Sequence, residues 1–70
     1  MKLHRVDSTG IRALGYDLDR ELLWVQYDSG SIYEYSGVPE DLYRRMLAAQ
    51  PHPWSRYGIE VKSYPGRMVR

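Results

Sequence analysis

Carboxylates and imidazoles are the side chains in this sequence that come nearest to catalytic or metal-binding chemistry. Asp17 and Asp19 form an Asp-x-Asp pair, a spacing that can ligate a divalent cation. Both fall in a polar turn, however, where aspartate more often hydrogen-bonds nearby backbone. His4 and His52 are far apart and have no neighbour at the spacing of metal ligands or of a general-base partner. We therefore predict no catalytic residue, no metal site and no cofactor, and we expect the protein not to be an enzyme.

Aromatic and basic side chains indicate binding instead. The chain has seven Tyr, two Trp and no Phe in 70 residues. Single-stranded nucleic acids stack their bases on aromatic rings that lie beside basic side chains. RNA is therefore the first candidate partner. The candidate nucleic-acid-binding residues are Trp24, Arg12, Trp54, Arg56, Lys62 and Arg67.

A protein partner or a second copy of the chain is the alternative. Leu22 and Trp24 alternate with Leu23 and Val25, so they point to the opposite face of the predicted sheet. An apolar second face is either covered by the chain's own termini or available for association. The sequence thus supports two hypotheses for a binding module and does not name its ligand.

Period-two patterns predict the strands that must position these residues. We expect three antiparallel strands over residues 11–16, 21–27 and 31–36. Residues 28–30, Asp-Ser-Gly, join the last two strands as a hairpin turn, because Gly accepts a positive φ and Asp and Ser bond nearby backbone.

Tyr33 and Tyr35 are the residues for which the pattern leaves two roles open. Antiparallel pairing places them on the same face as Leu23 and Val25, which favours packing between the sheet and a helix. The other role is contact with a ligand. If the two rings belong to the core, RNA binding must depend on Trp24, Trp54 or the basic tail.

An amphipathic helix over about residues 39–50 is predicted next. Pro39 has the fixed φ that suits a first helical turn. Glu40 and Asp41 follow it, where the helix dipole favours acidic side chains. The apolar stripe of this helix consists of Leu42, Tyr43, Met46, Leu47 and Ala49.

The segment after this helix has two interpretations. Ser55 suits the cap of a short helix over residues 55–61, whereas alternating apolar residues suit an edge strand over residues 57–63. Gly58 weakens both patterns, and we favour the helix.

These elements predict an α+β fold in one domain, residues 1–70. A three-stranded antiparallel β-meander packs against one amphipathic α-helix, and a short C-terminal helix or edge segment follows. Residues 1–9 and 65–70 are polar ends that we expect to be loosely attached and flexible.

Composition and charge exclude several classes of protein. The absence of cysteine excludes disulfides and thiolate zinc sites, and no phosphate-binding or dinucleotide-binding glycine motif occurs. No apolar stretch approaches ~20 residues, so we expect no membrane association and a cytoplasmic location. Residues 1–41 hold four basic and eight acidic side chains, and residues 42–70 hold six and one. Such halves either create a basic face or neutralise each other in the fold.

Two runs of the sequence resemble a known family. Residues 8–17 resemble the opening of the KTSC domain, a small bacterial-type family named after the C-terminal extension of some lysyl-tRNA synthetases. Residues 29–39 are similar to its central Tyr-x-Tyr motif, which Gly-Val-Pro follows, and an aromatic residue stands one turn into the helix. The motif residues here are Tyr33, Tyr35, Gly37, Pro39 and Tyr43.

The resemblance covers nearly the whole chain but implies little about activity. RNA binding is suggested only by the family's association with a tRNA synthetase, and no activity can be carried over. Residues 53–59 depart from the Gly-rich, Phe-containing segment that is usual after the helix in this family.

Overall fold

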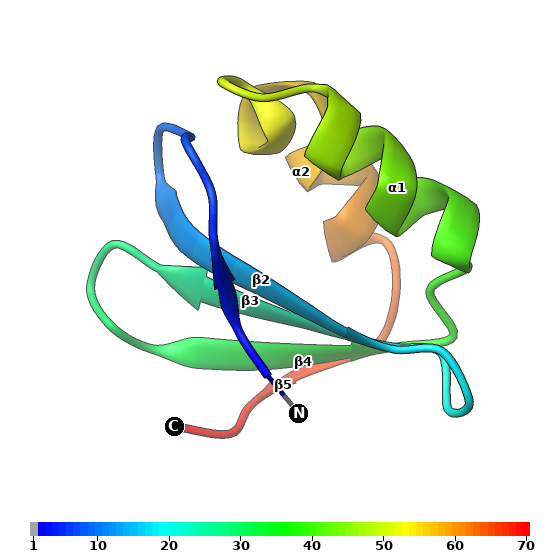
Figure 1. Cartoon of the computed structure of the whole chain (residues 1–70). Coiled ribbons are helices and arrows are strands. Elements are labelled where there is room, and N and C mark those ends of the chain that lie inside the picture. Colours follow the sequence, from blue (N-terminus) through cyan, green and yellow to red (C-terminus); the bar gives the residue numbers. More distant parts are fainter. Residues whose placement is uncertain (1) are drawn as a thin grey trace.

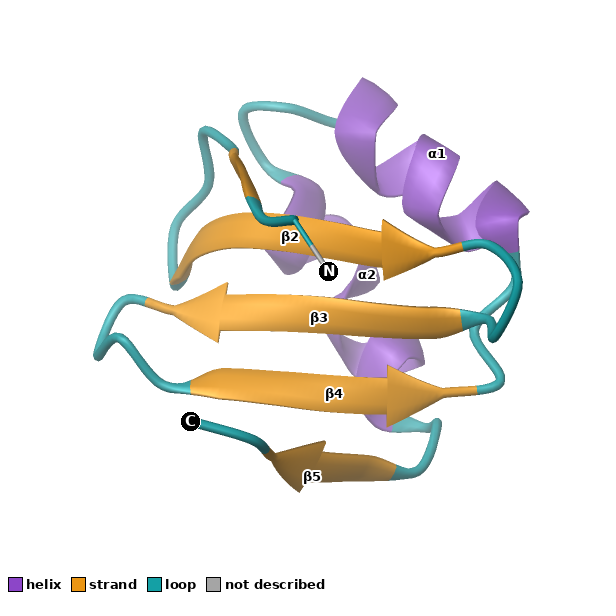
Figure 2. Ribbon diagram, turned by 60° about the horizontal axis from the view of Figure 1, so that its bottom comes forward, coloured by secondary structure: helices purple, strands orange, loops and turns teal. Residues whose placement is uncertain are grey.

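The computed structural model describes residues 2–70 as one antiparallel sheet with two helices on one face (Figure 1). The strands are His4–Arg5 (β1), Ile11–Asp17 (β2), Leu22–Tyr27 (β3), Ile32–Ser36 (β4) and Gly66–Met68 (β5), and the helices are Glu40–Ala48 (α1) and Pro53–Lys62 (α2). The order across the sheet is β1-β2-β3-β4-β5, so each strand lies beside its neighbour in sequence. Figure 2 shows the sheet from its other face, with both helices behind it.

The α+β class is confirmed, but the sheet has five strands rather than the three that the sequence predicts. The predicted meander corresponds to β2, β3 and β4, while β1 and β5 extend it at both edges. Every residue of β1 and β5 is exposed, so neither strand has the alternation that reveals a strand in a sequence. The two polar ends therefore supply both edge strands.

The register of the β3–β4 hairpin agrees with the alternation of the sequence. Leu23 pairs with Tyr35, and Val25 pairs with Tyr33, so all four side chains belong to the face that the helices cover. Gly30 has a φ of 96° in the connecting turn, a conformation that side-chain-bearing residues rarely adopt. The hairpin thus places Tyr33 and Tyr35 on the inner face of the sheet, the face that the helices cover.

Helix α1 follows Pro39 as predicted and ends two residues before the expected boundary. Leu42 and Met46 are fully buried, so the predicted apolar stripe faces the sheet. Val38, just before the helix, is also fully buried and fixes the angle at which the chain enters it.

Helix α2 confirms the helical interpretation of the tail, and the edge strand over residues 57–63 is wrong. The helix is longer than expected because Pro53 occupies its first turn, where no backbone N–H is needed. Gly58 is tolerated because the ring of Trp54 covers it: a Cβ at position 58 would lie 3.0 Å from Cε2 of Trp54.

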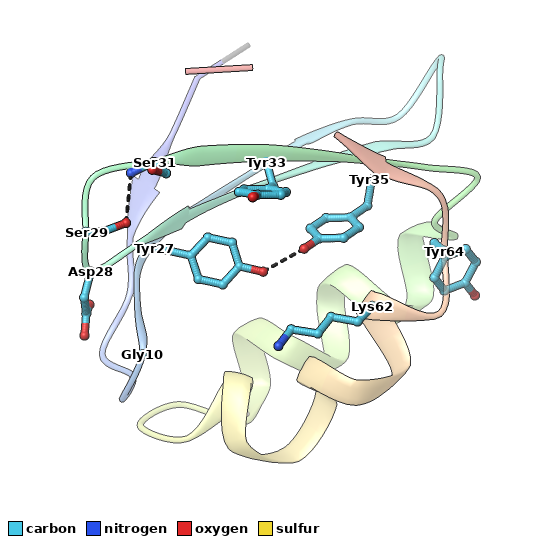
Figure 3. A pocket seen from close by; sticks show the side chains of 10 residues that line it. Gly10, Tyr27, Asp28, Ser29, Ser31, Tyr33, Tyr35, Lys62 and Tyr64 are labelled. Carbon is cyan, nitrogen blue, oxygen red and sulfur yellow. Dashed lines mark hydrogen bonds between the residues drawn. The ribbon is translucent and has the colours of Figure 1, made fainter. Parts of the chain in front are cut away.

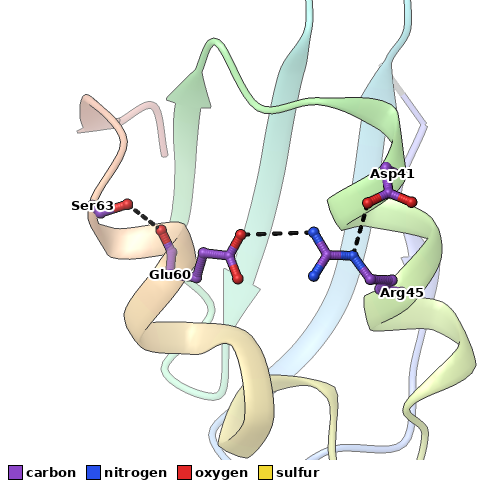
Figure 4. Close-up of polar contacts among 4 residues, drawn as sticks. All are labelled: Asp41, Arg45, Glu60 and Ser63. Atoms are coloured by element: carbon purple, nitrogen blue, oxygen red, sulfur yellow. Dashed lines mark hydrogen bonds and ion pairs between the residues drawn. The ribbon is translucent and has the colours of Figure 1, made fainter.

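Arg45 connects the two helices (Figure 4). Its guanidinium lies 2.9 Å from the Asp41 carboxylate in α1 and 3.7 Å from the Glu60 carboxylate in α2. It also lies over the ring of Tyr57, 5.5 Å from the ring centroid. At the end of α2, the hydroxyl of Ser63 donates to the carbonyl oxygen of Glu60. The contacts of Arg45 with Glu60 and Tyr57 set α2 beside α1.

The hydrophobic core lies between the sheet and both helices. Its buried residues are Ile11, Leu14, Leu23, Val25, Tyr35, Val38, Leu42, Met46 and Val61. Because Val61 belongs to α2, the second helix completes the core. The predicted arrangement with a single covering helix is therefore incomplete.

Candidate functional site

An open pocket of about 670 Å³ lies on the inner face of the sheet, where the β3–β4 hairpin meets the end of α2 (Figure 3). We call it the tyrosine pocket. It is lined by Gly10, Tyr27, Asp28, Ser29, Ser31, Tyr33, Tyr35, Lys62, Tyr64 and Gly66. The aromatic rings come from β3, β4 and the turn after α2, so segments distant in sequence build one site.

The rings of Tyr27, Tyr33 and Tyr35 form one wall of this pocket. The Tyr27 and Tyr33 rings are perpendicular, with centroids 5.4 Å apart, and the Tyr33 and Tyr35 rings are nearly parallel at 6.3 Å. The hydroxyl oxygens of Tyr27 and Tyr35 are 2.6 Å apart and share a hydrogen bond. Burial raises the pKa of Tyr27, and the hydrogen bond to Tyr35 raises it further, so the phenol is protonated at neutral pH.

Tyr33 and Tyr35 divide between the two roles that the sequence leaves open. Tyr35 is only 5% exposed and belongs to the core, as the pairing pattern predicts. Tyr33 is half-buried and packs at the margin of the core. Both rings also line the pocket, which Lys62 and Tyr64 close without any residue of α1.

Trp54 supports the pocket from outside its lining. A Cβ at Gly10 would lie 3.2 Å from Cδ1 of its indole, and Gly58 lies against another part of the same ring. The Tyr27 ring meets the indole perpendicularly, with centroids 5.4 Å apart. The ammonium of Lys62 lies 5.7 Å from the indole ring centroid. Trp54 is thus a packing residue that holds Tyr27 and Lys62 in place.

Arg12 lies beside the hairpin end of the pocket. Its Nη2 donates to the backbone carbonyl of Asp28 at 2.6 Å. In the part of the chain that the structure describes, neither Arg12 nor Lys62 forms an ion pair. Two uncompensated cations therefore flank the tyrosine pocket.

Trp24 and Arg67 lie on the other face of the sheet. The indole Nε1 of Trp24 donates to one carboxylate oxygen of Glu34 at 2.9 Å, and Arg67 contacts the other oxygen at 3.1 Å. The hydrogen bond from Trp24, with the neighbouring charge of Arg67, holds the pKa of Glu34 below its usual range although burial opposes this. The charge of Arg67 is thereby compensated.

The six candidate nucleic-acid-binding residues therefore do not form one surface. Lys62 lines the tyrosine pocket, Arg12 contacts the backbone of the lining residue Asp28 without lining the pocket itself, and Trp54 supports it. Arg56 is exposed on α2, with its guanidinium 5.9 Å from the Tyr57 ring centroid.

Several pocket residues are absent from the candidate set. Tyr27 shares a face with Tyr33 and Tyr35 by simple alternation, so the sequence held a signal for it. Ser29 and Ser31 carry turn signals only. Tyr64 has no local signal, because the fold of α2 alone decides where it lies.

Neither helix in residues 2–70 is long and apolar enough to cross a membrane. Within the same residues, no three His, Cys, Asp or Glu side chains gather closely enough to hold a metal ion. Asp17 lies at the end of β2, where its carboxylate accepts a hydrogen bond from the backbone N–H of Arg20 at 3.2 Å. This contact is the turn role that the sequence predicts for Asp17.

Comparison with known proteins identifies the family. The model of the KTSC domain matches residues 7–52, which include the Tyr-x-Tyr motif, Gly37 and Pro39. The chain belongs to the KTSC domain family. The resemblance read from the sequence is thus confirmed.

Relatives of this KTSC domain come from several bacteria. An uncharacterized protein of Stutzerimonas stutzeri is 37% identical over 49 residues, which cover 70% of this chain and 69% of that protein. A protein of Tsukamurella paurometabola is 36% identical over 45 residues, which cover 64% of this chain and 67% of the relative.

A solved structure extends the likeness beyond the matched residues. The crystal structure of a KTSC domain protein from Yersinia pestis superimposes with a TM-score of 0.89 at 26% identity. The superposition covers 99% of this chain and 97% of the other. Because α2 and β5 lie outside the family match, this structure shows that the fold of the whole chain is shared. The family match carries no established activity.

Proposed function

We propose that this KTSC domain is a non-catalytic module that binds single-stranded RNA at the tyrosine pocket. The observation that supports the proposal is a wall of three tyrosine rings with two cations beside it, Lys62 in the lining and Arg12 at Asp28, neither of which forms an ion pair within residues 2–70. Single strands are bound by stacking of bases on aromatic rings and by cations near the phosphates. A cytoplasmic location is part of the same proposal.

The proposal assigns unequal roles to the basic side chains. Lys62 and Arg12 are available for phosphates at the two ends of the pocket. Arg67 is engaged with Glu34 on the other face of the sheet, so its charge is compensated there and does not serve the pocket. Arg56 is exposed elsewhere on α2 and contributes only to the general field of the molecule.

An amide NMR titration with a short mixed-sequence RNA at low salt tests the proposal. We expect shifts at residues 10, 27–35 and 62–66, around the pocket. Lys62→Glu and Arg12→Glu should each weaken binding by about tenfold, because each replaces a phosphate-binding cation with a repulsive charge. Lys2→Glu changes the net charge equally at an exposed position and serves as the control. Absence of binding at low salt contradicts the proposal.

A second copy of the chain is the alternative ligand. The observation that favours it is the outer face of the sheet, where Leu22 and Trp24 are only half-buried. Self-association there predicts a dimer mass in solution that Trp24→Ser reduces to that of the monomer. A monomer at all concentrations contradicts this alternative.

A further inference from the structure

Resting on the proposed RNA-binding function, we infer that the tyrosine pocket is a subsite for one nucleotide, with the base against the tyrosine wall and its phosphate at Lys62. The subsite is defined by chemistry that a free mononucleotide also carries. It therefore predicts binding of a small ligand as well as of a strand.

The size and the wall of the pocket suit a flat ring. Its volume of about 670 Å³ falls within the range of roughly 300–1,000 Å³ that is typical of small-molecule sites. The half-buried ring of Tyr33 packs against the rings of Tyr27 and Tyr35. These contacts hold the Tyr33 ring in place before a ligand binds. A pre-positioned ring loses little conformational freedom on binding.

The Tyr27–Tyr35 hydroxyl pair offers a directed polar contact. Two hydroxyls contain two hydrogens, and their mutual bond at 2.6 Å uses only one of them. The second hydrogen is free to donate to an acceptor on a ligand, such as a carbonyl oxygen or ring nitrogen of a base. Both tyrosines line the pocket, so the donor belongs to the site.

Lys62 determines the charge of the ligand. An aromatic pocket alone would also suit an organic cation, since tyrosine rings attract cations over their faces. Lys62 lines the same pocket, with its ammonium 5.7 Å from the Trp54 ring centroid, and it forms no ion pair within residues 2–70, so a second cation would be repelled. Figure 3 shows its side chain reaching from α2 toward the rings, while Asp28 lies at the other end. A ligand that combines a planar base with an anionic group matches both features.

The test compares four ligands by amide NMR with the full chain: uridine 5′-monophosphate, uridine, inorganic phosphate and the short RNA. We expect the mononucleotide to shift the amides of Tyr27, Tyr33 and Lys62. Uridine and phosphate should each bind at least about tenfold more weakly, because each lacks one of the two recognised groups.

Two variants assign the two halves of the ligand. Lys62→Met keeps an unbranched apolar side chain without the charge and should reduce mononucleotide binding to the level of uridine, whereas Lys2→Met should leave it unchanged. Tyr33→Leu should reduce it to the level of phosphate. Tyr57→Leu makes the same change on α2 outside the pocket and should have no effect. Thermal unfolding of each variant confirms that it is folded.

The outcomes separate this inference from the proposed function. Binding of RNA at the pocket without binding of the mononucleotide overturns the subsite and leaves the proposed function in place. RNA shifts away from the pocket overturn the subsite and the proposed location of RNA binding. Binding of the mononucleotide without binding of the RNA supports the subsite and overturns the proposal that the domain binds single-stranded RNA. Failure of both ligands overturns both proposals.

Discussion

Gly66 in β5 leaves the space that the ring of Tyr35 fills. A Cβ at position 66 would lie 2.5 Å from Cε1 of Tyr35, closer than real side chains approach, so the ring would have to move. Tyr35 is buried and its hydroxyl is hydrogen-bonded to that of Tyr27, so its ring has little freedom to move. Packing of an aromatic ring over a glycine on the neighbouring strand is a known means of stabilising a sheet.

Gly66→Ala is therefore expected to destabilise the domain by about 1–3 kcal/mol, the usual cost of overpacking. Urea unfolding measures the change, and the amide of Tyr27 should shift as the hydroxyl pair is disturbed. In a Tyr35→Leu background the penalty should fall, since the clashing ring is absent. An equal penalty in both backgrounds contradicts this account of Gly66.

Glu34 is the residue whose charge links stability to pH. Its folded pKa is lowered by Trp24 and Arg67, so the ionised form contributes stability above the ordinary value of 4.5. That contribution is lost as the pH falls through the lower folded pKa. Glu34→Gln should thus reduce the free energy of unfolding by about 1 kcal/mol at pH 7.

Urea unfolding of this variant and of the parent at pH 7, 5 and 3 tests the link. The difference in stability should persist at pH 5 and narrow at pH 3. Glu40→Gln, at a more exposed ion pair within α1, should cost only about 0.2–0.5 kcal/mol at pH 7. A difference for Glu34→Gln that is equally large at pH 3 would exclude its charge as the cause.

At the scale of elements, the position of α2 beside α1 depends on contacts that involve Arg45. Within residues 2–70, its neighbour Arg44 forms an ion pair with Glu40 inside α1 alone and is the natural control. Arg45→Met should destabilise the domain by up to about 1 kcal/mol more than Arg44→Met, since Arg45 also contacts Glu60 and Tyr57. Urea unfolding of the two variants at low salt measures the difference. Equal losses would show that the contacts between the helices add nothing.

Elements with their own periodic pattern were predictable, and elements that depend on a partner were not. The meander over β2, β3 and β4 and the helix α1 follow from alternation, a hairpin turn and an apolar stripe. β5 contains Gly66, Arg67 and Met68, all exposed, and becomes a strand only because β4 offers an unpaired edge. The same reason explains β1.

The candidate site follows the same division. Residue types that suit nucleic-acid binding were visible in the sequence, and so was the shared face of the hairpin tyrosines. The proximity of Lys62 to Tyr27 depends on the return of α2 across the sheet, which no local pattern encodes. Trp24 and Arg67 have the side-chain chemistry of nucleic-acid-binding residues, yet both contact Glu34 on the other face of the sheet.

For the whole molecule, part of the charge of the basic C-terminal half is balanced by acidic side chains of residues 1–41. Among the described residues, three of the four ion pairs join an acidic side chain in residues 1–41 to a basic one in residues 42–70. These pairs favour the neutralising interpretation over a single basic face. Three of the six basic side chains of residues 42–70 are compensated in this way: Arg44, Arg45 and Arg67.

Binding at the tyrosine pocket alone predicts a shallow salt dependence of RNA binding. If only Arg12 and Lys62 neutralise phosphates, the slope of log K against log salt should be about −1.4 for a single strand. Use of all six basic residues of the C-terminal half would give about −4. Fluorescence anisotropy over a series of salt concentrations distinguishes the two, and the steeper slope would contradict binding at the pocket.

The two indoles of the chain lie on opposite faces of the sheet, which makes the domain its own optical reporter. Trp54 lies between Gly10 and Gly58 and beside Lys62, so its emission should respond to an occupant of the tyrosine pocket. Trp24 is hydrogen-bonded to Glu34 on the outer face of the sheet, so its fluorescence emission should respond to a second copy of the chain that binds there. Quenching in a Trp24→Phe chain and in a Trp54→Phe chain would then tell, without any added dye, which face a ligand has reached.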